Sequence, residues 1–159
     1  MLSRIIDNIS RQDKGLHVLF GLLEEEFSLL TGHEPRAISS CEFSIQELLR
    51  QIAVERVSLR GHVKALVPGA RNLRDLLPNL DADQTQILRL AMDSVDAIEQ
   101  RCAIQAEKNA QLANALAEQS RTMLDFMHKQ IQPKNKDTYS HKGRYTQVHA
   151  EATLFRGRL

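Results

Sequence analysis

Between Asp81 and Pro133 the chain contains neither proline nor glycine, and no other feature of the sequence limits the fold as strongly. Proline and glycine are the residues that most often end or interrupt a helix. Asp81, followed three residues later by Gln84, is typical of a helix start. The simplest prediction is therefore one helix over residues 82–132, about 50 residues long.

This stretch carries apolar and small side chains at alternating steps of three and four residues, the spacing of a coiled-coil seam. Gln105 and Asn109 stand where apolar side chains are expected, and a buried amide lowers stability unless it is hydrogen-bonded. These two amides either set the register inside a helical bundle or form a contact site. The full seam is Leu88, Ala91, Val95, Ile98, Cys102, Gln105, Asn109, Leu112, Leu116, Gln119, Met123 and Phe126.

Two further helices are predicted upstream, over residues 2–31 and 45–67. The first carries a stripe sustained over four heptads, which favours packing along a long partner helix. The second begins at a capping box formed by Ser44 and Glu47 and ends before Pro68. The stripe of the first helix consists of Leu2, Ile9, Leu16, Leu23 and Leu30, with Ile6, Phe20 and Phe27 between them.

The composition supports an all-α fold, because aromatic residues are only 4% of the chain and tryptophan is absent. We expect an elongated antiparallel bundle or coiled coil of three long helices and one short one, with the longest helix last. Residues 1–132 form the helical domain in this prediction. Residues 133–159 form a flexible tail with six Lys or Arg and two acidic residues, a net charge of 6 − 2 = +4.

The predicted lengths do not match one another. At 1.5 Å per residue the last helix spans about 75 Å, whereas the first and second span about 42 and 35 Å. Roughly the last 20 residues of the long helix are therefore expected to lack a partner in this chain. The apolar side chains of this part form the C-terminal apolar face: Leu116, Met123, Leu124, Phe126, Met127 and Ile131.

Three interpretations of this face remain open: it binds a partner chain, it associates with a second copy, or it folds back on the protein. Met123 and Met127 favour the first, because flexible thioether side chains repack around different apolar ligands. A methionine at a heptad position is, however, more often plain core.

Several function classes are not supported by the residues. The charge balance of 21 basic and 20 acidic residues indicates neither nucleic acid nor a charged membrane as a partner, and no apolar run is long enough to insert in a bilayer. The six histidines form no metal-binding pattern, and Cys41 and Cys102 form neither a zinc motif nor a nucleophile pair. We expect no enzyme, no cofactor and no metal.

Two segments carry a resemblance to a known family. Residues 107–116 open the final amphipathic region, and residues 138–144 form Thr-Tyr-Ser-His-Lys-Gly-Arg after a proline. Together with the order of the helices, they resemble the FlgN-like family of flagellar type III export chaperones. Thr138 stands where the family's Leu-Tyr-x-x-x-Gly element usually has leucine. Leu112 and Ala113 stand where a second asparagine and a glycine are frequent.

The resemblance implies a cytoplasmic chaperone that binds hook-filament junction proteins through its C-terminal amphipathic helix. It also implies delivery to a membrane component of the export gate, with the export ATPase complex as a further partner. Tyr139 and Gly143 match the element implicated in docking to the gate, and the C-terminal apolar face lies in the cargo-binding region.

The competing interpretation is a self-associating coiled-coil structural or adaptor protein without export cargo. In that case the same face pairs with its own copy. A weak homo-oligomer is also compatible with the chaperone interpretation.

Overall fold

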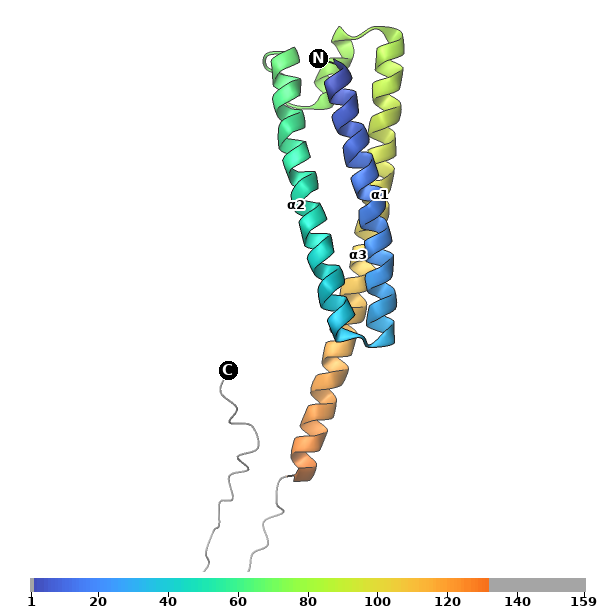
Figure 1. Ribbon diagram of the computed structural model, residues 1–159, viewed down its shortest axis with the longest axis vertical. Helices are drawn as coiled ribbons and strands as arrows, with labels where there is room; N and C mark the ends of the chain where they lie inside the picture. Colours follow the sequence, from blue (N-terminus) through green and yellow to red (C-terminus); the bar gives the residue numbers. More distant parts are fainter. Residues whose placement is uncertain (1, 132–159) are drawn as a thin grey trace, which may run out of the picture. The chain divides into compact units, whose positions relative to one another are not determined.

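The computed structural model describes residues 2–131, and helices connected by short turns are the regular secondary structure of this part of the chain (Figure 1). Its elements are α1 (Leu2–Gly32), α2 (Pro35–Leu66), the 3-10 helix η1 (Leu73–Asn79) and α3 (Ala82–Ile131). The all-α prediction with the longest helix last is confirmed. The chain divides into two units, residues 1–113 and 114–159. The predicted tail at 133–159 lies outside the described residues.

The second helix begins earlier than the sequence predicts, at Pro35 rather than at residue 45. Proline is well tolerated in the first turn of a helix, because the amide hydrogen it lacks would have no partner there. Ser44 is not a cap; its hydroxyl donates to the carbonyl of Ser40 at 3.1 Å inside the helix. Such back-bonding satisfies a serine hydroxyl in a helix interior, so the predicted capping box at Ser44 is wrong.

Within the first unit, α1 and α2 are antiparallel, because Asn8 pairs with Glu55 near one end and Leu22 with Cys41 near the other. Only His33 and Glu34 separate the two helices. His33 has a φ of 58°, the left-handed conformation that commonly ends a helix. The reversal is therefore made by a very short turn.

The α1 and α3 helices run parallel in this unit, in a register that repeats every seven residues. Cys102 and Asn109 donate to the carbonyls of Leu16 and Leu23, respectively. A second pair of contacts between the two helices is also spaced by seven residues. Ser94 donates to Asp13, and the Arg101 guanidinium lies over the Phe20 ring, 4.3 Å from its centroid. This repeat is the packing of a coiled coil.

Two clusters of buried side chains form the core of the first unit. One lies towards the α1–α2 turn and includes Leu19 and Ile98. The other joins the start of α1 to η1 and to the start of α3 through Ile5, Leu76 and Leu88, all three with no exposed surface. Figure 1 shows η1 beside the N-terminal end of α1. The short helix therefore closes one end of this unit.

Candidate functional site: an apolar face on the last helix

The buried seam of α3 stops at Asn109, the last residue of the helix that is buried in the described part of the chain. The next seam positions, Leu112 and Leu116, are only partly covered. From Ala117 to Ile131 every side chain is exposed. Burial therefore ends well before the helix does.

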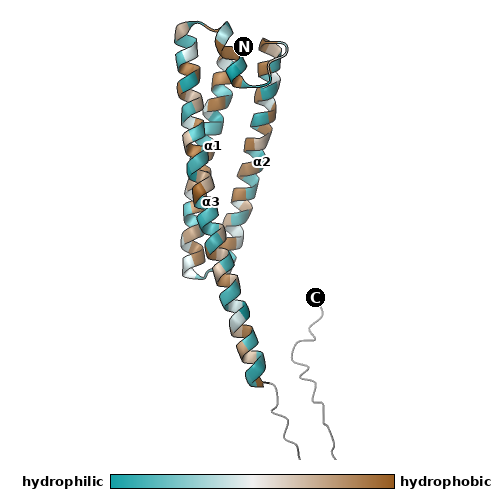
Figure 2. Ribbon diagram, turned by 180° about the vertical axis from the view of Figure 1, so that it is seen from behind, coloured by the Kyte–Doolittle hydropathy of each residue, from teal (hydrophilic) through white to brown (hydrophobic). Residues whose placement is uncertain are grey.

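The described part of the second unit, residues 114–131, is one helical segment with two different sides. Five members of the C-terminal apolar face, all except Leu116, have between 48% and 64% of their surface exposed. Leu116, Met123 and Met127 follow one another at seven and four residues, so they share one side of a helix. Figure 2 shows brown and teal residues interspersed along this part of α3.

The other side of the same segment is polar. Arg121 and Glu118 form an ion pair at 3.8 Å, and Thr122 donates its hydroxyl hydrogen to the Glu118 carbonyl at 3.0 Å. Asp125 and Lys129 are also exposed. Two acidic and two basic residues balance one another here, so the segment combines an exposed apolar side with no net formal charge from its Asp, Glu, Lys and Arg residues.

All six residues that the sequence assigns to the C-terminal apolar face are therefore in one helical segment. Five are open to solvent and Leu116 is partly covered. Tyr139 and Gly143, predicted to dock to the export gate, lie outside the described residues. Their role stays a prediction.

The two seam amides are explained inside the first unit. Asn109 is 4% exposed and donates to the Leu23 carbonyl at 2.7 Å and to the Glu26 carboxylate at 2.6 Å. Gln105 donates to the Asn109 side-chain oxygen at 3.0 Å. This arrangement supports the register interpretation of the two amides, since Asn109 is not accessible to a partner.

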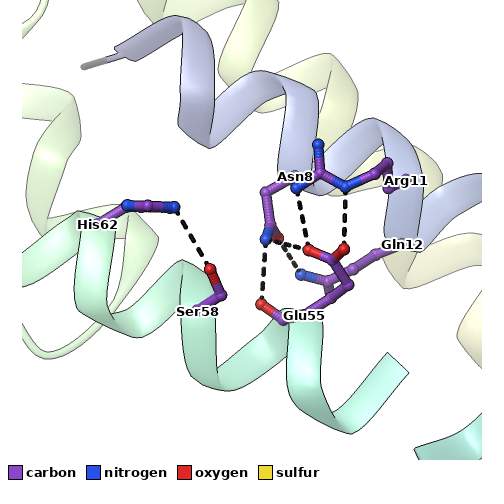
Figure 3. A network of polar contacts seen from close by, with 6 residues as sticks. All are labelled: Asn8, Arg11, Gln12, Glu55, Ser58 and His62. Carbon is purple, nitrogen blue, oxygen red and sulfur yellow. Dashed lines mark hydrogen bonds and ion pairs between the residues drawn. The ribbon is translucent and has the colours of Figure 1, made fainter. Parts of the chain in front are cut away.

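A polar cluster between α1 and α2 was missed by the sequence analysis. Asn8 has no exposed surface, and its amide donates to the backbone carbonyl and the carboxylate of Glu55 (Figure 3). Gln12, also buried, donates to the Asn8 side-chain oxygen at 2.6 Å. The sequence signal was present, because Asn8 and Gln12 occupy neighbouring turns of one helix face.

Arg11 completes this cluster with two hydrogen bonds to the Glu55 carboxylate, at 2.9 and 3.0 Å. The hydrogen bond from Arg11 lowers the pKa of Glu55, and the same bond raises the pKa of Arg11. In the described residues no buried side-chain nitrogen or oxygen lacks a hydrogen-bond partner. The cluster is thus a satisfied structural contact.

Both cysteines are buried in the first core cluster. Cys41 donates to the Leu22 carbonyl at 3.3 Å, and Cys102 to the Leu16 carbonyl at 3.4 Å. Burial raises the pKa of both thiols. The predicted helix bounds, 2–31 and 45–67, leave Cys41 between two helices, which is wrong because it lies inside α2.

Residues 2–131 hold no group of three or more His, Cys, Asp and Glu side chains that could bind a metal ion. In the same part of the chain, no helix combines the length and apolar character needed to cross a membrane.

The family model described as FlgN protein matches residues 1–147. No curated protein and no solved structure matches the chain.

Proposed function

Because this chain belongs to the FlgN family, whose members are flagellar export chaperones, we propose that its cargo is the hook-filament junction proteins. In this proposal the cargo binds the C-terminal apolar face in the cytoplasm. The chaperone then presents it to a membrane component of the export gate, with the export ATPase complex as a further partner.

The observation that carries the proposal is the exposure of this face. Met123, Phe126 and Met127 have 64%, 62% and 48% of their surface open to solvent. Large apolar side chains that cluster in the open mark interaction sites. An amphipathic helix from the cargo is the partner that matches, because it can lay its apolar side along a second helix.

Binding would be driven by the removal of apolar surface from water, at roughly 25 cal/mol per Å². This gain is offset by the ordering of a cargo segment that is unfolded before export. The two methionines adapt to different cargo side chains, because their side chains are unbranched and flexible. The expected affinity is moderate, which permits release at the gate.

The gate would recognise a different part of the chain. Tyr139 and Gly143 lie less than 15 residues after Ile131, the last residue of the C-terminal apolar face. Separate recognition elements would let the chaperone hold cargo and gate together.

Titration calorimetry with a C-terminal peptide of a junction protein tests the cargo site. The double variant Met123→Asp with Phe126→Asp adds two negative charges to the apolar face and should weaken binding at least tenfold. A matched control, Thr122→Asp with Lys129→Gln, lowers the net charge by the same two units on the polar side and should bind as the parent does.

The free energy of unfolding of the cargo-site variant should stay within about 0.5 kcal/mol of the parent, as expected for exposed positions. No binding by the parent chain, or equal binding by the cargo-site variant, would contradict the proposal.

Gate docking is tested separately with Tyr139→Ala. This variant should keep its affinity for the cargo peptide and lose its affinity for the cytoplasmic part of the gate component. Loss of both affinities would mean that the two sites are not separate.

The competing interpretation, self-association through the C-terminal apolar face, predicts a dimer that Phe126→Asp dissociates. Sedimentation at several concentrations decides between the two, since the chaperone proposal expects the oligomeric state to be unaffected by this substitution.

A further inference from the structure

The side of α2 that faces away from the core carries a second stripe of heptad spacing. We call it the outer stripe. Its three apolar members, Phe43, Val54 and Val57, are between 62% and 71% exposed. Alternating steps of four and three residues place all the members on one side of the helix. They are Phe43, Glu47, Arg50, Val54, Val57 and Gly61.

The end of the outer stripe has room for a side chain from elsewhere. Apart from its own helix backbone, a Cβ added at Gly61 would meet no atom of the described residues within 4 Å, so no contact within residues 2–131 requires glycine there. Glycine inside a helix lowers stability relative to alanine. A large side chain of another molecule that packs against this bare backbone would account for it.

The middle of the outer stripe borders a groove between α1 and α2. The groove has a volume of about 480 Å³, and Glu47, Arg50 and Val54 lie along it. Leu48 and Ile52 give it apolar surface. The groove therefore lies beside the outer stripe, on the side towards α1, whereas the open space at Gly61 lies at one end of the stripe.

We propose that two copies of this protein pair through their outer stripes, with the two α2 helices antiparallel. A two-fold axis level with Ile52 then brings Phe43 of each copy against Gly61 of the other. The largest side chain of the stripe, Phe43, therefore lies opposite the glycine, which has no side chain. The two-fold symmetry forms this contact twice.

The charged positions select the antiparallel orientation. In a parallel pair, Glu47 would face Glu47 and Arg50 would face Arg50, and both layers would repel. In the antiparallel pair, Glu47 faces Val57 and Arg50 faces Val54. The two charges already compensate each other within one helix, where Arg50 Nη1 lies 2.6 Å from Glu47 Oε2, so the long stem of Arg50 can cover the valine of the other copy.

In the antiparallel pair, the residues at one end of the stripe are complementary to those at the other end, and this correspondence identifies the binding partner as a second copy of the chain. An unrelated helix would need no correspondence between the two ends of this stripe. With only three apolar side chains from each copy, the dimer is expected to be weak and concentration-dependent.

Sedimentation of the full chain over a range of concentrations tests the pairing. Gly61→Leu fills the space that Phe43 of the other copy would occupy and should weaken dimerisation at least tenfold. Leucine is the better helix former, so lost dimerisation cannot be attributed to unfolding. Gly21→Leu, at an exposed glycine of α1 with the same open surroundings, is the matched control and should leave the dimer unchanged.

Disulfide trapping tests the orientation. A mixture of Phe43→Cys and Gly61→Cys chains should form a covalent dimer on mild oxidation, whereas Phe43→Cys alone should not. A monomer at every concentration, a dimer indifferent to Gly61→Leu, or efficient cross-linking of Phe43→Cys alone would overturn the proposal. The cargo-site variant Met123→Asp with Phe126→Asp should dimerise as the parent does, which keeps this result independent of the proposed chaperone function.

Discussion

The side-chain amide of Asn109 donates a hydrogen bond to the backbone carbonyl of Leu23 at 2.7 Å. One heptad earlier on both helices, Cys102 donates to the carbonyl of Leu16. Two polar side chains of α3 thus contact the backbone of α1 at equivalent levels. Because each needs one particular carbonyl, they fix the register of two helices that apolar packing alone would hold less specifically.

Replacing Asn109 by alanine should lower the free energy of unfolding by about 1–3 kcal/mol. The substitution removes the bonds to Leu23 and Glu26 and leaves Gln105 without its acceptor. Urea denaturation measures the change. Asn114→Ala, at an exposed position of the same helix, is the control and should stay within about 0.5 kcal/mol of the parent.

The Arg11–Glu55 pair should make stability depend on pH in a defined direction. Glu55 has a lowered pKa in the folded protein, so its contribution is fully present above the pKa of an unfolded glutamate, about 4.3. The contribution is lost as the pH falls through the lower, folded value. Compared with Glu55→Gln, the parent should therefore be more stable at neutral pH, with a difference that shrinks below about pH 4.3.

The difference in stability between the parent and Glu55→Gln is followed through their denaturation midpoints between pH 3 and pH 7, measured about every half pH unit. A difference that stays constant over the range would show that the carboxylate charge does not contribute.

The two native thiols should react slowly with a disulfide reagent while the protein is folded. Both are buried and both have a raised pKa, so the thiolate forms only when the structure opens. We expect labelling to be slower than for a free thiol by on the order of 100-fold or more, and to become fast in urea. A cysteine placed at the neighbouring exposed position, Ala103→Cys, should label at once, whereas equal rates at both positions would contradict the buried environment of Cys102.

Two glycines of α1 should respond differently to substitution. Apart from its own helix backbone, Gly21 has no atom of the described part of the chain within 4 Å of an added Cβ, so Gly21→Ala should raise the free energy of unfolding by up to about 1 kcal/mol. At Gly15 an added Cβ would lie 3.4 Å from Ile52 Cγ1. Gly15→Leu should therefore overpack the α1–α2 contact and lower the free energy of unfolding by about 1–3 kcal/mol. Thermal melts compare the two, and a stabilising Gly15→Leu would refute the close approach of these helices.

The bounds of α3 could be predicted because strong local signals mark both of its ends. Asp81 and Pro133 enclose an uninterrupted stretch, and the helix observed is Ala82–Ile131. The start of α2 could not be predicted in the same way. Ser44 carries the local pattern of a cap, and only the tertiary position of the preceding turns, with Cys41 buried against α1, shows that it lies within a helix.

The polar cluster was missed for a different reason. A single seam was expected for α1, with Ile6, Phe20 and Phe27 completing it, yet Phe27 is exposed while Asn8 and Leu19 are buried. The α1 helix packs against two helices at once, so its buried surface is wider than one seam. Asn8 and Gln12 fall on the side that faces α2, which a search for apolar spacing does not detect.

The seven-residue repeat between α1 and α3 has a consequence for how chains of this kind can change in length during evolution. Removing one residue between Cys102 and Asn109 would turn everything after it by about 100° and carry Asn109 away from Leu23. Removing seven residues from both helices would leave the remaining α1–α3 pairs in place, as would adding seven. We therefore expect relatives of different size to differ by whole heptads in these two helices, and insertions of other lengths to gather in the segment between α2 and α3.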